Sequence, residues 1–200
     1  MSGNYGRQAL GKRAQHEAAL LAEAARLFRR KGYAATGTNE ILAAAGAPRG
    51  SLYYYFPGGK EEIGARAIEE AGKLVTLTLK RLTAETDSPA DFVERYAGML
   101  AGWIEKSGYR DGCPVTTTLL ENAPDSEAIT RVGREAFRHW RRTVEAMLAK
   151  HGWPEERRPA TARMIMMALN GAQTHARAEG STEPLQECAR ELRMLLEAGN

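Results

Sequence analysis

The chain has 200 residues, of which 43% are apolar and 26% charged, and no apolar run is long enough to span a membrane. Its two cysteines, Cys113 and Cys188, are too few for a disulfide framework, and no Cys/His cluster has zinc-site spacing. The N-terminus has basic residues but lacks the apolar core of a signal peptide. We therefore expect a cytoplasmic protein with reduced thiols, no metal, no cofactor and no membrane partner.

The net charge of +3 is unevenly distributed along the chain. Residues 1–60 carry nine basic and three acidic side chains, a net charge of +6, whereas residues 61–200 have a net charge of −3. A basic head on a mildly acidic body indicates that the head meets a polyanion such as DNA or RNA. A basic face that is simply solvated is the alternative.

The expected elements are all helices, because good helix formers fill the chain and no run alternates with the period of a strand. Gly and Pro residues divide the chain into about nine helices, three of them in an N-terminal head. We predict them near residues 7–31, 39–45, 48–56, 60–82, 89–106, 115–122, 125–150, 155–178 and 183–198.

Two short helices in the head are joined by a tight turn at Gly46. Thr38 is the expected N-cap of the first of them, with Thr36 as the alternative. The next helix is predicted to start at Pro48 or Arg49, because proline suits a first helical position, and to end before Pro57. Two short helices around a glycine turn are typical of a helix-turn-helix.

The segment from about residue 17 to residue 65 resembles the DNA-binding head of the TetR family. It has a Phe-x-x-x-Gly-Tyr helix end at 28–33, an Ala-Gly turn at 45–46 and a Leu-Tyr-x-x-Phe helix at 52–56. The run at 53–61, the Cys-Pro-Val at 113–115 and residues 176–180 are similar to the LmrA/YxaF-like branch. The resemblance implies a DNA-binding domain at residues 1–60 and a ligand-binding and dimerisation domain at residues 61–200.

The third helix is expected to bury Leu52 and Phe56, four residues apart, and to leave its other side for DNA. Glycine allows a close approach of the backbone, arginine can pair with guanine or phosphate, and tyrosine hydroxyls can donate to phosphates. The family pattern adds a lysine as a phosphate anchor. Tyr53 could also pack partly against the first helix, and Thr38 can act as a cap with or without DNA. The predicted DNA-binding residues are Thr38, Arg49, Gly50, Ser51, Tyr53, Tyr54 and Lys60.

For the body, the resemblance implies dimerisation through the last two helices, a small-molecule inducer and a pocket for it. An intramolecular core is the alternative role for the apolar residues of these helices, which are Met164, Ile165, Met167, Ala168, Gly171, Ala172, Leu185, Cys188, Leu192, Leu195 and Leu196. Aromatic, methionine and polar side chains are typical of a ligand cavity, although any one of them could be core. The predicted ligand-binding residues are Trp103, Thr116, Thr117, Leu120, Phe137, Trp140, Met167 and Asn170.

The leading hypothesis is a ligand-responsive repressor that binds a pseudo-palindromic operator as a homodimer and is released by a small-molecule inducer. A helical enzyme is the second hypothesis. It is disfavoured because the chain has no Glu-x-x-His repeats, no Gly-x-Ser-x-Gly elbow and no glycine-rich phosphate loop. A helical protein-interaction adaptor is the third hypothesis, and the basic head argues against it. We therefore predict a regulator and not an enzyme.

Overall fold

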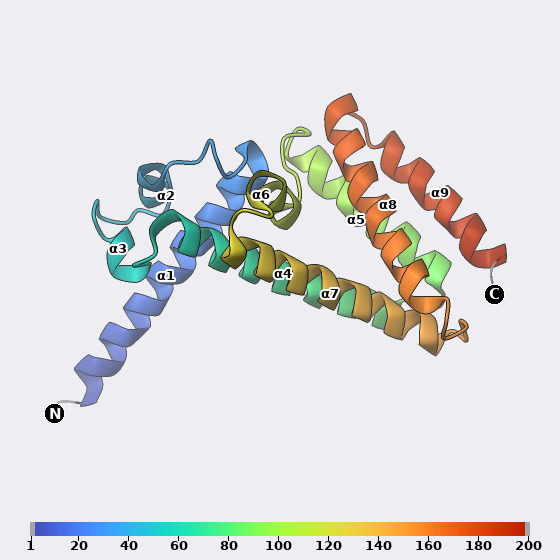
Figure 1. Ribbon diagram of the computed structural model, residues 1–200, viewed down its shortest axis with the longest axis horizontal. Helices are drawn as coiled ribbons and strands as arrows, with labels where there is room; N and C mark the ends of the chain where they lie inside the picture. The colour runs from blue at the N-terminus through green and yellow to red at the C-terminus, as the bar shows by residue number, and fades with distance from the viewer. Residues whose placement is uncertain (1–2, 199–200) are drawn as a thin grey trace. The chain divides into compact units, whose positions relative to one another are not determined.

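The computed structural model describes residues 3–198, with side chains from residue 13 onward, and contains nine helices and no strand in that range (Figure 1). The helices are α1 Gly3–Lys31, α2 Thr38–Ala44, α3 Leu52–Tyr55, α4 Gly59–Glu85, α5 Pro89–Lys106, α6 Pro114–Asn122, α7 Glu127–Lys150, α8 Arg158–Glu179 and α9 Glu183–Ala198. The predicted all-α class is confirmed. None of the described helices is long and apolar enough to cross a membrane.

The chain forms two compact units that do not follow the sequence order. Unit 1 comprises Met1–Ala71 and Pro114–Gly133, and unit 2 comprises Gly72–Cys113 and Arg134–Asn200. The helices α4 and α7 therefore contribute to both units, and α6 belongs to the same unit as the N-terminal head. The functional boundary between residues 60 and 61 stays a prediction.

Unit 1 is organised by a core that α1 shares with the short helices. Seven residues in α2 and four in α3 are too few for stable isolated helices, so tertiary burial must hold them. Fully burying a single large apolar side chain contributes about 1.5–3 kcal/mol. The buried residues of this core are Leu20, Leu21, Ala24, Leu27, Phe28, Ile41, Leu42, Leu52, Phe56, Ile63 and Ala67.

Helix boundaries in the head correct the prediction in two places. The N-cap of α2 is Gly37, with φ −84° and ψ 149°, and Thr38 is the first helical residue with no side-chain cap. Thr36 is no cap either, because its buried hydroxyl donates to the Gly32 carbonyl at 2.7 Å. The third helix begins at Leu52 and not at Pro48 or Arg49, because Gly50 adopts φ +89°, a left-handed conformation that interrupts a right-handed helix.

In unit 2, α5 packs against α8 and α9. Phe92, Tyr96 and Leu100 of α5 are buried, as are Ile165 and Leu169 of α8. The predicted interface residues Ile165, Ala172, Leu185, Leu192 and Leu196 are therefore buried within their own chain, which is the intramolecular alternative. Cys113 and Cys188 are half-buried and are not joined in a disulfide.

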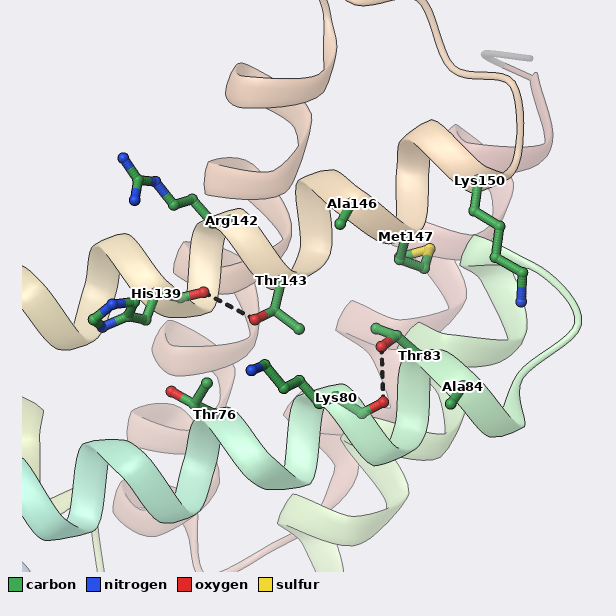
Figure 2. Close-up of a pocket in the computed structure, with 10 residues that line it drawn as sticks. All are labelled: Thr76, Lys80, Thr83, Ala84, His139, Arg142, Thr143, Ala146, Met147 and Lys150. Atoms are coloured by element: carbon green, nitrogen blue, oxygen red, sulfur yellow. Dashed lines mark hydrogen bonds between the residues drawn. The ribbon is translucent and has the colours of Figure 1, made fainter.

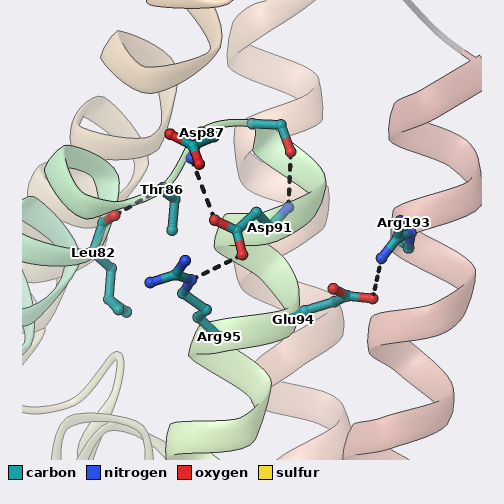
Figure 3. A network of polar contacts seen from close by, with 8 residues as sticks. Leu82, Thr86, Asp87, Asp91, Glu94, Arg95 and Arg193 are labelled. Carbon is teal, nitrogen blue, oxygen red and sulfur yellow. Dashed lines mark hydrogen bonds and ion pairs between the residues drawn. The ribbon is translucent and has the colours of Figure 1, made fainter.

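Polar contacts cap the start of α5 and connect it to α9 (Figure 3). The Ser88 hydroxyl accepts a hydrogen bond from the Asp91 amide at 3.0 Å, as an N-cap does, and the Asp91 carboxylate accepts one from Arg95 Nε at 2.8 Å. Arg193 of α9 donates to Glu94 of α5 at 2.7 Å. The Asp91–Arg95 pair lies within α5 and the Glu94–Arg193 pair joins α5 to α9, and such exposed pairs contribute little free energy of folding.

The contact between α4 and α7 in unit 2 depends on a glycine. A Cβ at Gly72 would lie 2.9 Å from the Cβ of Ala136, and the carbonyl of Gly72 accepts a hydrogen bond from Trp140 Nε1 at 3.0 Å. The Trp140 side chain is almost completely buried, so this bond satisfies its only polar atom.

Substituting Gly72→Ala should therefore lower the free energy of unfolding by about 1–3 kcal/mol, because the added methyl group overlaps Ala136. Gly98→Ala in α5 is the matched control, since a Cβ there meets nothing within 4 Å, and it should stabilise by up to about 1 kcal/mol. Urea unfolding followed by circular dichroism compares the two variants. Equal stabilities would contradict the close-packing interpretation.

Candidate nucleic-acid interface

The two sides of α3 differ sharply in exposure. Leu52 and Phe56 are buried as predicted, whereas Tyr53 and Tyr54 are 67% and 63% exposed. Two neighbouring large aromatic side chains that face solvent from a rigid core are unusual unless they contact a partner. Their hydroxyls can donate to phosphate oxygens.

Three further predicted contacts lie in the turn before α3 and not on the helix. Arg49, Gly50 and Ser51 form an exposed to half-exposed turn, and the Ser51 amide and hydroxyl both donate to the Pro48 carbonyl, at 3.1 and 2.7 Å. The Ser51 hydroxyl proton is thus already used. Arg49 is exposed and its guanidinium can reach outward, while the half-buried Thr38 lies at the first position of α2.

Two side chains of α1, Arg13 and His16, lie beside Tyr54 and Tyr55. The Arg13 guanidinium carbon is 5.0 Å from the Tyr54 ring centroid, a cation–π distance. Tyr54 and Tyr55 meet edge to face with centroids 5.0 Å apart, and the Tyr55 hydroxyl lies 3.3 Å from Nδ1 of His16. The structure therefore adds Arg13 as a cation at the exposed side of α3. Sequence reasoning missed it because 41 positions separate Arg13 from Tyr54.

Lys60 does not extend freely into solvent. Its amino group is 4.4 Å from the Tyr33 ring centroid and donates to the Ala34 carbonyl at 3.3 Å. Burial lowers the pKa of Lys60 below its ordinary value, and the nearby Glu121 carboxylate acts in the opposite direction. Its predicted role as a phosphate anchor stays a prediction, and it would require this contact to be replaced or shared.

A carboxylate on α6 holds the connection between α1 and α2. Glu121 accepts hydrogen bonds from the Tyr33 amide at 3.1 Å and from the Ala34 amide. One turn earlier on α6, the Thr117 hydroxyl lies 3.3 Å from the Phe28 carbonyl and 3.3 Å from the Pro114 carbonyl of its own helix, and its one proton is shared between them. The Glu121 bonds give acceptors to two amides just past the end of α1, whereas the Phe28 carbonyl also accepts from the Gly32 amide at 2.9 Å. No local sequence signal indicates the contacts of α6 with this part of the chain, because the partners are 87 to 89 positions apart.

The predicted ligand-binding residues are divided between the units. Thr116, Thr117 and Leu120 lie on α6 in unit 1, and the other five lie in unit 2. Phe137 and Trp140 are in contact, with ring centroids 5.2 Å apart. The Thr116 hydroxyl is buried and has no hydrogen-bond partner among the described residues.

Several of these side chains are exposed to solvent or already form hydrogen bonds within the protein. Leu120 is 81% and Met167 63% exposed, and Trp103 is also exposed, so burial gives no support to a pocket-lining role for them. Trp140 and Thr117 make the hydrogen bonds described above, and Asn170 is half-buried. The ligand-binding assignment therefore stays a prediction. No group of three or more His, Cys, Asp or Glu side chains in the described part of the chain could hold a metal ion.

Comparison with known families identifies both parts of the chain. Residues 20–67 match the model for bacterial regulatory proteins of the tetR family, and residues 89–191 match the C-terminal domain of LmrA/YxaF-like transcriptional regulators. The HTH-type regulator YxaF of Bacillus subtilis is 32% identical over 76% of this chain and 80% of its own length. LmrA of the same organism is 30% identical over 76% of this chain and 81% of its own length.

Solved structures share the fold at lower sequence identity. A TetR-family regulator from Agrobacterium tumefaciens superposes with a TM-score of 0.80 at 20% identity, covering 92% of this chain and 98% of that one. The reduced form of NemR from E. coli gives a TM-score of 0.76 at 21% identity, covering 88% of this chain and 95% of that one. These relatives are transcriptional regulators and not enzymes.

Removing the Glu121 carboxylate with Glu121→Ala should destabilise unit 1 by about 1 kcal/mol, because two backbone amides lose a charged acceptor and exchange it for water. Asp125→Ala is the matched control, since Asp125 is an exposed acid in the same unit for which no contact is described. Urea unfolding of both variants measures the difference. A Glu121 variant as stable as the Asp125 variant would show that the carboxylate does not hold this connection.

Proposed function

The chain belongs to the TetR family of bacterial regulatory proteins, in its LmrA/YxaF-like branch, and from that premise we propose a ligand-responsive repressor. It binds a pseudo-palindromic operator as a homodimer and is released by a small-molecule inducer. DNA-binding regulation follows from the family itself, and the repressor role, the dimer and the release are the proposal. The observation that carries it is the exposed tyrosine pair of α3 on a rigidly packed head.

DNA recognition in this proposal uses both the helix and the turn before it. A major groove about 12 Å wide admits one α-helix, and α3 is short and has a polar exposed side. Tyr53 and Tyr54 donate to phosphates, and Arg49 pairs with a guanine or a phosphate. Arg13 adds positive charge close to Tyr54. The net charge of +6 over residues 1–60 attracts the polyanion from a distance.

Exposed apolar side chains on α8 and α9 support the homodimer. Met164 and Met167 follow one another at helical spacing on α8 and are exposed, and the exposed Gly171 one turn further on leaves room for a close approach of another helix. On α9, Met194 and Leu195 are 54% and 56% exposed. Apolar side chains grouped at this spacing are typical of a helix that packs against a partner, and two helices from each subunit make a four-helix interface.

Release by an inducer requires a ligand whose affinity differs between two conformations of the protein. The helix α6 is suited to this role, because it carries three predicted ligand-binding residues together with the Glu121 carboxylate that holds Tyr33 and Ala34. A ligand that displaces α6 would disturb the connection between α1 and α2, and operator affinity would fall. The protein acts in the cytoplasm, where its DNA is.

Operator binding is tested by gel shift and fluorescence anisotropy with DNA from upstream of the chain's own gene. Arg49→Gln and Tyr54→Phe should each weaken binding without lowering the melting temperature. If Arg49 contacts a phosphate, the slope of log affinity against log salt should fall by about 0.9. Lys106→Gln, at an exposed lysine that ends α5, is the control. A wild-type protein with no salt-sensitive shift on such DNA would overturn the proposal.

The dimer is tested by introducing charge into the exposed faces of α8 and α9. Met167→Glu and Leu195→Glu should each shift the protein from dimer to monomer in sedimentation equilibrium and weaken operator binding. Leu74→Glu is the matched control, because Leu74 is 66% exposed on α4, outside these two helices. Dimers of unchanged stability in both interface variants would argue for a different interface.

A further inference from the structure

A groove of about 570 Å³ runs between α4 and α7 in unit 2 (Figure 2). It includes none of the eight residues that the sequence predicts for ligand binding. Residues from both helices line it along about three helical turns, and they are Thr76, Lys80, Thr83, Ala84, His139, Arg142, Thr143, Ala146, Met147 and Lys150.

The three threonines of the groove have already used their hydroxyl protons. Thr76 donates to the Gly72 carbonyl at 2.9 Å, Thr83 to the Lys80 carbonyl at 3.0 Å, and Thr143 to the His139 carbonyl at 3.0 Å. Each is a bond back to the same helix, so the threonines have no hydroxyl proton left for a ligand. Together with the methyl groups of Ala84 and Ala146 and the side chain of Met147, they make a largely apolar wall.

Positive charge surrounds this wall and no carboxylate lines it. Lys80 comes from α4, and Arg142 and Lys150 come from α7. The nearby carboxylates Glu85 and Glu145 are paired with Arg81 and Arg141, and none of the groove's three permanent cations has an ion-pair partner among the described residues. Figure 2 shows the Lys80 amino group lying in the gap between the two helices, whereas Arg142 points away from it.

We propose that this groove binds a small amphipathic anion, an acid whose single negative group joins an apolar alkyl or aromatic part. The apolar part lies along Ala84, Ala146 and Met147, and the anionic group is held by Lys80, whose amino group lies between the two helices, while Lys150 adds positive charge at the other end of the groove. The volume lies in the range of small-molecule sites, about 300–1,000 Å³. A nucleic acid would contact only the cations, through its phosphates, and would leave the apolar wall uncovered. The apolar wall therefore favours an amphipathic ligand over a nucleic acid.

The proposal goes beyond the repressor function, because it concerns binding to the free protein and needs neither operator nor inducer release. Isothermal titration calorimetry on the whole protein without DNA tests it, with decanoate as the probe at concentrations below micelle formation. Decan-1-ol has the same chain without the charge, and decylammonium has the opposite charge. Decanoate should bind more tightly than both, and its affinity should fall between about 0.05 and 0.5 M salt.

Two pairs of variants locate the site. Lys80→Gln and Lys150→Gln should each weaken decanoate binding by up to about fivefold, with Lys106→Gln unchanged as the control. Ala146→Trp should fill the groove and abolish binding, whereas Ala149→Trp, exposed on the same helix but outside the groove, should not. Thermal unfolding verifies that all variants are folded.

Equal affinity for decanoate and decan-1-ol would overturn the proposed role of the cations. Decanoate binding that survives Ala146→Trp would place the ligand outside this groove. An absence of decanoate binding to the wild-type protein would overturn the proposed site. Gel shifts in the presence of decanoate form a separate measurement, because operator affinity can stay constant while the groove is occupied. Failure of the groove and failure of the repressor proposal are therefore distinguishable.

Discussion

The DNA-binding head depends on helices that cannot exist alone. Seven residues in α2 and four in α3 form too few backbone hydrogen bonds to offset the loss of chain entropy. The core around Phe28 and Leu20 therefore determines both where α3 lies and how firmly it is held. Since Tyr53 and Tyr54 project from the side opposite to this core, their positions are fixed by apolar packing and need no polar contacts of their own.

Electrostatics act at the other end of the head, around the connection between α1 and α2. Tyr33 and Ala34 offer two amides and one carbonyl there, and these groups bind the oppositely charged Glu121 and Lys60. The Lys60 ammonium also lies over the Tyr33 ring, so one short segment connects α6 and the start of α4. Its hydrogen bonds are exposed to solvent, which makes this connection easier to rearrange than the apolar core.

Local patterns in the sequence were sufficient for the class of fold and for most helices. The Ser88 cap and Pro89 mark the start of α5 in the sequence as clearly as in the structure, and α9 spans the predicted residues. The predicted helix start and helix cap were wrong at positions where the residue type suits a helix terminus but the backbone or side chain makes a different local contact. Pro48 and Arg49 suit a helix start, but the left-handed Gly50 delays α3 to Leu52, and Thr36 closes the end of α1 and does not cap α2.

The candidate site shows the same division between local and distant information. The apolar spacing of Leu52 and Phe56 was enough to predict which side of α3 is buried. Glu121 and Arg13 could not be found in this way, because their partners are brought to them only by the packing of α6 and α1. The apolar pattern of α8 and α9 could not tell an internal core from a subunit interface, because both require apolar residues at helical spacing.

The hydrogen bond from Trp140 to the Gly72 carbonyl also gives the molecule an optical reporter. The emission of an indole depends on its polarity and hydrogen bonding, and this one is enclosed and bonded to the backbone of the facing helix. Any sliding or rotation of α4 against α7 in unit 2 breaks that bond and shifts the emission of Trp140. Trp153 is buried outside both helices and Trp103 is exposed, so replacing these two with phenylalanine leaves Trp140 as the sole indole that reports on this contact.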